Sequence, residues 1–238
     1  VVVREVRPEM CKDPEAVALL LHDQERARRL SAGNIVQLLK VWRDGARIVL
    51  ATEHVPGPPL SEVLRRAAAS RAPLPVESVL SVALEVARAL ESAHQNAEGP
   101  LVHGDLRPQW VLLDHVGTVK LGGFGFCRFL SVADPGGRWC VHDGRCFQPP
   151  ERLDAGAPPH PRLDVFATGA LLLEALGAPG PYGALAGPEQ LLAALREGRV
   201  DLDALEIPAD IAAVVRRACA PRPEQRHADM GALAAAIH

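Results

Sequence analysis

The chain has 238 residues, a formal net charge of −3 at pH 7 and 23% charged residues. This near-neutral balance gives no electrostatic footprint for nucleic acid or for an anionic membrane surface. No apolar run is long enough to span a bilayer, and the N-terminus lacks the pattern of a signal peptide. The five cysteines are odd in number and scattered, so no disulfide framework is predicted and a cytoplasmic protein is expected.

The first quarter of the chain is predicted to be rich in strands. Hydrophobic periodicity and β-branched runs predict a strand, a helix and two more strands, over 1–6, 14–30, 35–42 and 47–53. Asp44 and Gly45 form a hairpin-turn pair between the last two strands. Three prolines within 55–59 then break the chain, because proline continues neither a central strand nor a helix interior.

The remainder is predicted to be mainly helical. Helices are expected over 61–69, 76–95 and 164–176, with three or four more between 188 and 237. A small hairpin over 110–113 and 118–121 is embedded among them, and residues 127–150, rich in Gly and Pro, are predicted to be irregular. A sheet segregated at one end of a helical chain indicates the α+β class. We expect one domain over 1–238, with a small part over 1–55 and a larger one over 56–238.

Eight motifs resemble those of protein kinases, in the order of that family. Residues 101–113 read Leu-Val-His-Gly-Asp-Leu-Arg-Pro-Gln-Trp-Val-Leu-Leu, which resembles the catalytic loop His-Arg-Asp-Leu-Lys-Pro-Glu-Asn-Ile-Leu-Leu. Residues 120–125 read Lys-Leu-Gly-Gly-Phe-Gly, which resembles the strand that leads into Asp-Phe-Gly. Weaker resemblances to Val-Ala-Ile-Lys, His-Pro-Asn-Ile-Val, the hinge strand, Ala-Pro-Glu, the central helix and the terminal Pro-x-x-Arg fall at 1–4, 34–36, 48–55, 149–151, 164–169 and 223–226. The resemblance implies a two-lobed fold with a small strand-rich N-lobe, lacking the first two strands of the family in this chain, and a larger helical C-lobe.

The resemblance also assigns chemistry to positions that are substituted in this sequence. In the family, a strand Lys, a helix Glu, a loop Asn and the Asp of Asp-Phe-Gly hold the nucleotide and its two metal ions, and the Arg before the catalytic base receives a loop phosphate. The corresponding residues are Arg4, Asp23 with Glu25 as the other candidate, Trp110, Gly123 and Gly104. Glycine carries no carboxylate and an indole nitrogen only donates, so we predict that no metal and no cofactor is bound.

Asp105 stands at the position of the catalytic base. A base without metal neutralisation gives little catalysis, so we predict that Asp105 is structural and that no residue is catalytic. The segment 127–148 holds one hydroxyl residue, Ser131, and no tyrosine, so activation by loop phosphorylation is not expected.

Other retained positions are architectural in the family. His103 and Phe124 correspond to residues that stack in its regulatory spine, and Asp164 to the residue that braces the catalytic-loop backbone. Glu151 and Arg226 correspond to a buried ion pair that ties the activation segment to the C-lobe. Fold supports are thus retained while chemical groups are lost, which favours a binding role.

We therefore predict a catalytically inactive pseudokinase, not an enzyme, that serves as a protein-binding scaffold or allosteric regulator in signalling. It is loosely similar to scaffolds such as the PEAK family, and a homo- or hetero-dimer is left open. The alternative is a nucleotide-binding, weakly active unconventional kinase, with Thr52 as gatekeeper and the backbone of Glu53 and Val55 binding adenine. A plain structural domain without a site of its own is a third hypothesis.

Overall fold

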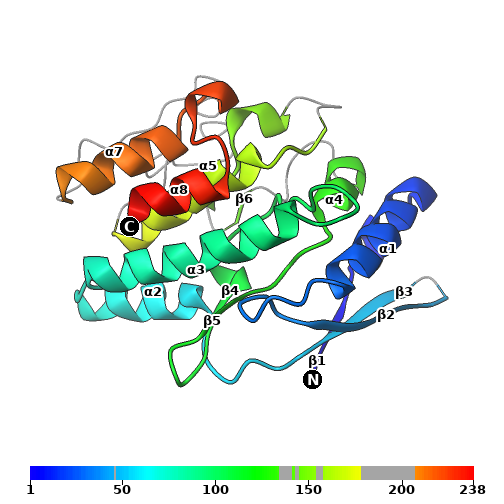
Figure 1. The fold of residues 1–238 in the computed structure, drawn as a ribbon. Coiled ribbons are helices and arrows are strands. Elements are labelled where there is room, and N and C mark those ends of the chain that lie inside the picture. The colour runs from blue at the N-terminus through cyan, green and yellow to red at the C-terminus, as the bar shows by residue number, and fades with distance from the viewer. Residues whose placement is uncertain (46, 134–140, 143–144, 154–157, 178–206) are drawn as a thin grey trace.

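The N-terminal part of the fold is a small sheet covered by one helix (Figure 1). The computed structural model describes the chain except for residues 46, 134–140, 143–144, 154–157 and 178–206. Its antiparallel sheet has the order β1-β3-β2, from strands β1 (Val2–Glu5), β2 (Leu38–Asp44) and β3 (Arg47–Thr52). Helix α1 (Pro14–Arg28) begins where Asp13 accepts a hydrogen bond from the Glu15 amide, since an N-cap acceptor satisfies a free helix donor.

The larger part is helical. Its helices are α2 (Leu60–Ser70), α3 (Val76–His94), α4 (Cys127–Ala133), α5 (Arg162–Ala175), α7 (Ala209–Ala218) and α8 (Met230–Ile237). Short hairpins pair β4 (Val111–Leu113) with β5 (Val119–Leu121) and β6 (Val141–His142) with β7 (Arg145–Cys146). Single 3-10 turns occupy Pro8–Met10, Pro108–Trp110, Pro150–Leu153 and Pro223–Gln225. Every residue from Leu163 to Ala175 is buried, so α5 forms the centre of this part.

Backbone hydrogen bonds join the two parts directly. The Val36 amide donates to the Leu121 carbonyl at 2.9 Å, and the Leu121 amide donates to the Asn34 carbonyl at 2.9 Å. The linker follows the same hairpin, because the Leu113 amide donates to the Pro58 carbonyl at 3.1 Å. The β4–β5 hairpin therefore holds both lobes at the place where the catalytic-loop segment ends.

The prediction that residues 127–150 are irregular is wrong for the first part of that segment. Residues Cys127–Ala133 form α4, because Phe129 and Leu130 are buried and Arg128 pairs with Asp23 of α1. The predicted helices between 188 and 237 lie partly outside the described residues, which contain α7 and α8 in that range. Within the described part of the chain, no helix is both long and apolar enough to cross a membrane.

Candidate functional site

The catalytic-loop segment is held by a buried carboxylate from the start of α5. Asp164 is fully buried and accepts hydrogen bonds from the amides of His103 and Gly104, each at 2.8 Å. His94, the last residue of α3, places its Nε2 at 2.8 Å from the same carboxylate. Burial by itself would raise the pKa of Asp164, but the His94 hydrogen bond, the nearby histidine charges and the Gly104 amide hold it below its usual value.

Sequence analysis missed His94. His94 could have been recognised from its place on the apolar face of the predicted helix 76–95, four residues after Leu90 and near the end of that helix. A polar residue at such a position needs a buried partner, and Asp164 supplies it.

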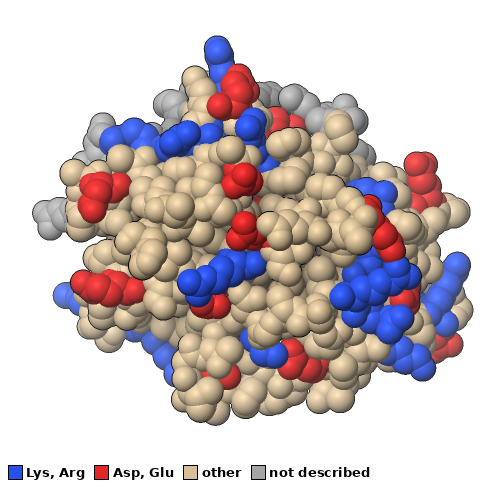
Figure 2. Space-filling model, in the orientation of Figure 1, with Lys and Arg blue, Asp and Glu red and all other residues tan. Residues whose placement is uncertain are grey.

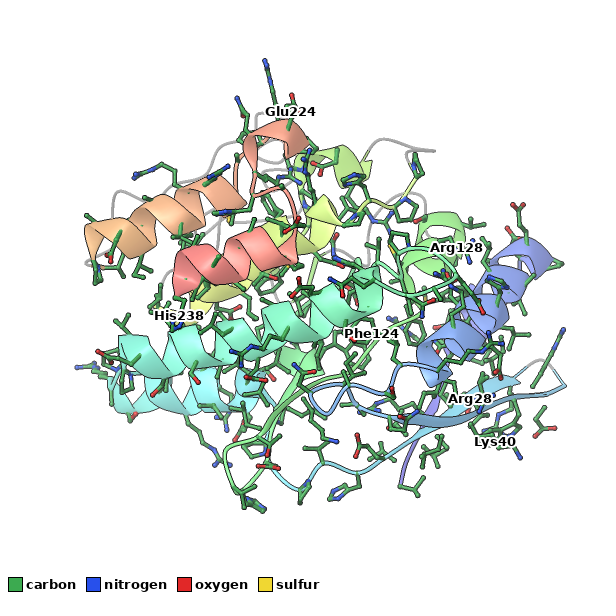
Figure 3. All side chains as sticks on the ribbon, in the orientation of Figure 1. Arg28, Lys40, Phe124, Arg128, Glu224 and His238 are labelled. Carbon is green, nitrogen blue, oxygen red and sulfur yellow. The ribbon has the colours of Figure 1, made fainter. Side chains whose placement is uncertain are left out.

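The rings of His103 and Phe124 meet edge to face, with centroids 4.9 Å apart. The His103 Nε2 lies 2.8 Å from the Gly122 carbonyl, and the Gln24 amide group of α1 donates to the Phe124 carbonyl at 3.1 Å. Figure 3 shows Phe124 between α3 and α1. The structure thus brings these two rings together at the junction of the lobes, and their regulatory role stays a prediction.

Glu151 and Arg226 also meet as a pair. The Arg226 guanidinium donates to the two Glu151 carboxylate oxygens at 2.6 and 2.8 Å. Arg226 is buried and joins the Pro150–Leu153 turn to the segment before α8.

Asp105 is a buried member of the interlobe site, which we define as Arg4, Thr52, Asp105, Trp110 and Gly123. Its Oδ2 accepts from Arg107 Nη2 at 2.6 Å and from Trp110 Nε1 at 3.4 Å. Its Oδ1 has no hydrogen-bond partner among the described residues. Burial raises the pKa of the Asp105 carboxyl, and the opposing Arg107 and His103 charges and the Trp110 hydrogen bond do not cancel that effect. One carboxylate oxygen is therefore available to accept a proton.

The Trp110 indole lies flat against Gly123. A Cβ atom on Gly123 would stand 2.6–2.9 Å from three carbons of the indole, and Gly123 has a φ of +87°. The indole also stacks on Phe126 with centroids 6.4 Å apart, and the Arg4 guanidinium lies 5.7 Å from its ring centre. The side chain at position 110 thus fills the space beside position 123.

Arg4 and Asp23 do not form the ion pair that the family resemblance implies. Arg4 Nη1 donates to the Thr52 hydroxyl at 3.2 Å. Asp23 instead accepts from Arg128 Nε of α4 at 2.7 Å and from the second Arg128 nitrogen, and Arg26 lies at 3.5 Å. Glu25, the other candidate, has a half-exposed side chain and pairs with Arg28 on the surface of α1.

Charges of both signs lie together over this face of α1 (Figure 2). They include the pairs Arg28–Glu25 and Arg29–Glu98. These surface pairs contribute little to stability, because solvent screens them. The Asp23–Arg128 pair, in which the Asp23 carboxylate is buried and Arg128 is partly exposed, joins α4 to α1.

Gly104 is packed against Cys127 at the start of α4. Its φ is +63°, and a Cβ at this position would stand 2.1 Å from the Cys127 Sγ. Burial raises the pKa of Cys127 to about 12, so its thiol stays protonated and unreactive. An arginine at position 104 would not fit without movement of α4.

The predicted hinge leaves two backbone groups without partners. The Glu53 side chain accepts from Lys120 Nζ at 2.7 Å and from the Gln37 amide at 2.8 Å. In contrast, no hydrogen bond of the Glu53 carbonyl or the Val55 amide is found within the described part of the chain. Val55 as a residue is buried, and most backbone groups of buried residues are paired. Thr52, Arg4, Trp110 and Gly123 line a cavity of about 50 Å³ next to this segment.

The residues present do not fit the two metal ions that the fold family implies. Gly123 and Trp110 offer no acidic or amide oxygen from their side chains, and the indole occupies the space beside Gly123. Of the residues described, no group of three His, Cys, Asp or Glu side chains is arranged to hold a metal ion.

Comparisons with known proteins agree on the family. A model of the protein kinase domain matches residues 2–233. The chain is 29% identical to the tyrosine-protein kinase MasK of Myxococcus xanthus over 100% of this chain and 38% of that protein. It is 30% identical to the serine/threonine-protein kinase PknK of Mycobacterium tuberculosis, over 91% of this chain and 19% of that protein.

The fold has a close solved counterpart. The crystal structure of the Mycobacterium tuberculosis PknI kinase domain superposes with a TM-score of 0.72 and 26% identity, over 99% of this chain and 83% of that chain. The chain spans half or less of the length of the curated relatives named here, including PknL of Mycobacterium tuberculosis, of which it covers 50%.

These comparisons contradict the prediction of a pseudokinase that is not an enzyme and works as a scaffold. The named relatives are serine/threonine and tyrosine kinases, and none of them is a PEAK scaffold. The prediction gave too much weight to two lost metal ligands. Phosphoryl transfer depends on positioning and charge, and the chain keeps a carboxylate at Asp105 and a cation at Arg4.

The motif order, the two-lobed fold and the family match over residues 2–233 lead to one conclusion. This chain belongs to the protein kinase domain family.

Proposed function

We propose that the chain binds a nucleotide between its lobes and transfers the terminal phosphoryl group, at a low rate, to a hydroxyl group of a protein. The unpaired Glu53 carbonyl and Val55 amide carry this proposal. A carbonyl acceptor and an amide donor two residues apart match the exocyclic amino group and the adjacent ring nitrogen of adenine. Binding would give the Val55 amide a hydrogen-bond partner.

The reaction uses Asp105 as the general base. The hydroxyl oxygen of the substrate attacks the terminal phosphorus, and its proton passes to the Asp105 carboxylate. The bond from that phosphorus to the bridging oxygen breaks, and the nucleoside diphosphate leaves with the electron pair. Arg4 provides positive charge beside the phosphates. A raised pKa suits a base that must take up a proton near neutral pH.

We further propose the class of substrate, the cellular location and the domain organisation. The names of the relatives support hydroxyl side chains of proteins as substrates, so the protein partners are proposed to be substrates. The thiols of Cys11, Cys127 and Cys219 are unbridged, which supports a cytoplasmic location. We treat 1–238 as a single domain divided at the linker 55–59, and a dimer stays a prediction.

Adding ATP is expected to raise the thermal unfolding temperature of the chain. A ligand that binds only the folded state stabilises it by about 2.7 kcal/mol at a hundred times its dissociation constant. Val55→Pro removes the hinge amide and is expected to abolish this shift, whereas Val55→Ala keeps the amide and the shift. Differential scanning fluorimetry measures both. A chain whose unfolding temperature does not respond to ATP under any condition would contradict the proposal.

Asp105→Asn is expected to lower phosphoryl transfer about 10²–10⁴-fold while the ATP-induced thermal shift remains. Because the pKa of Asp105 is raised, wild-type activity should fall as the pH is lowered through that raised value and the base becomes protonated. Transfer of labelled phosphate to a generic protein substrate, measured across pH, tests this. Unchanged transfer by Asp105→Asn would exclude Asp105 as the base.

The raised pKa of Asp105 also affects the stability of the fold, which is expected to change with pH in the opposite direction to the activity. A carboxyl with a raised pKa in the folded state favours folding at low pH, and this contribution is lost as the pH rises through the folded pKa. At pH 7, Asp105→Asn should therefore unfold at the same temperature as the wild type or higher. An equal or higher unfolding temperature for Asp105→Asn would support an active-site role, and a lower one would support a structural role.

A further inference from the structure

We infer that this site takes its nucleotide without a divalent cation, with Arg4 as the counter-charge of the phosphates and Trp110 in the space of a metal-binding side chain. The inference rests on the proposed nucleotide binding and specifies its ligand as the metal-free nucleotide. It follows from three features of the interlobe site. The indole leaves no room for a side chain at position 123, the charge of Arg4 has no ion pair among the described residues, and the cavity is small.

The steric exclusion comes from the contact between Trp110 and Gly123. No side chain can stand at position 123 while the indole keeps its place, because even a Cβ would lie 2.6 Å from the ring. In this position the indole contacts Phe126, Arg4 and Asp105. In this arrangement neither position that would hold a metal ion in the family offers an oxygen ligand, because position 110 is an indole and that indole leaves no room for a side chain at position 123.

The charge of the site is positive at Arg4. No ion pair of Arg4 is found in the part of the chain that the structure describes, and its one hydrogen bond goes to the neutral Thr52 hydroxyl. The carboxylate that would neutralise it, Asp23, is occupied by Arg128 and Arg26. A planar guanidinium donates two parallel hydrogen bonds to a phosphate and is always charged, so an exposed Arg4 suits this role.

The size of the site requires the indole to move. The cavity beside Thr52 and Trp110 measures about 50 Å³, whereas pockets for ligands of this kind are of order 300–1,000 Å³. The contacts that hold the indole are weak, since its bond to Asp105 is 3.4 Å long and Arg4 lies 5.7 Å from the ring centre, near the limit of a cation–π contact. A nucleotide that displaced the indole would meet the Arg4 guanidinium.

The test measures ATP affinity of the whole chain by isothermal titration, once in EDTA and once in excess Mg²⁺. The expected result is binding in EDTA, with an affinity that Mg²⁺ changes by less than about twofold. Arg4→Ala should weaken binding in EDTA about tenfold or more, the usual effect of a lost charge-assisted hydrogen bond, and Arg4→Lys should recover part of it. Arg28→Ala, which removes a surface cation of α1, is the matched control and should leave the affinity unchanged.

Each other result would overturn the inference in a recognisable way. Binding that requires Mg²⁺ would overturn it and leave the proposed nucleotide binding standing. Absence of binding in both solutions would overturn the proposed function and this inference with it. Equal affinities of Arg4→Ala and wild type would remove Arg4 as the counter-charge.

A second set of variants tests the steric part. Trp110→Asn combined with Gly123→Asp opens the space and adds both oxygen ligands, so this double variant should bind ATP at least tenfold more tightly in Mg²⁺ than in EDTA. Trp110→Asn alone should not gain this metal dependence, because position 123 still lacks a carboxylate. A double variant that folds and still ignores Mg²⁺ would show that these two positions do not set the metal requirement.

Discussion

Replacing Arg226 with alanine is expected to lower the free energy of unfolding by about 3–5 kcal/mol, the usual cost of breaking a buried ion pair. Arg226 is buried, and two of its five N–H groups donate to Glu151. The other three donate to backbone carbonyls, those of Ala220, Arg162 and Pro221. Its guanidinium also lies 5.0 Å from the centre of the Phe166 ring. Alanine would leave a carboxylate and three carbonyls without these donors.

Urea unfolding at pH 7 measures this effect. Arg222→Ala removes an exposed arginine four residues away and should change the free energy of unfolding by no more than about 0.5 kcal/mol. Glu151→Gln, combined with Arg226→Ala in a double-mutant cycle, should show a coupling of at least about 1 kcal/mol. If Arg226→Ala were no more destabilising than Arg222→Ala, the bonds described would not contribute to stability.

Replacing Asp164 with alanine is also expected to lower the free energy of unfolding by about 3–5 kcal/mol. The substitution leaves the buried amides of His103 and Gly104 and the ring of His94 without their acceptor. Each buried donor left unsatisfied costs about 1–3 kcal/mol. The catalytic-loop backbone would also lose its support, so phosphoryl transfer should fall together with stability.

The pH dependence identifies the carboxylate as the cause. Because the pKa of Asp164 is depressed in the folded state, its contribution is present above the usual carboxyl pKa of 3.8 and is lost as the pH falls through the folded value. The difference in stability between wild type and Asp164→Ala, measured in urea, should shrink from pH 7 towards pH 3. Asp229→Ala, which removes the N-cap of α8, should cost only about 1 kcal/mol. A pH-independent difference would point to packing alone.

Elements with local signals in the sequence were predicted well. The helix expected over 14–30 is observed as Pro14–Arg28, since Asp13 and Pro14 mark its start, and the helix expected over 76–95 is observed as Val76–His94. In contrast, α4 was missed because it is short and follows a glycine-rich stretch. Its stability comes from the Asp23–Arg128 pair and the burial of Phe129, contacts between segments about a hundred residues apart.

The motifs located the positions of the site but not the partners of each residue. The family pattern assigned positions to Arg4, Asp23 and Asp105, and these assignments stay predictions. The pattern does not say that Arg128 pairs with Asp23 or that Arg4 lies over the Trp110 ring. Such choices depend on side chains from different elements that meet only after folding. The prediction of an inactive scaffold is contradicted by the named relatives, because it was drawn from the loss of the two metal ligands.

The two glycine contacts also couple pairs of positions in mutational change. A side chain at position 123 meets the Trp110 indole, and a side chain at position 104 meets the Cys127 thiol. A substitution of either glycine therefore requires its neighbour to move or to become smaller. The residues allowed at positions 123 and 104 thus depend on those at positions 110 and 127, although none of these four side chains needs to contact a ligand.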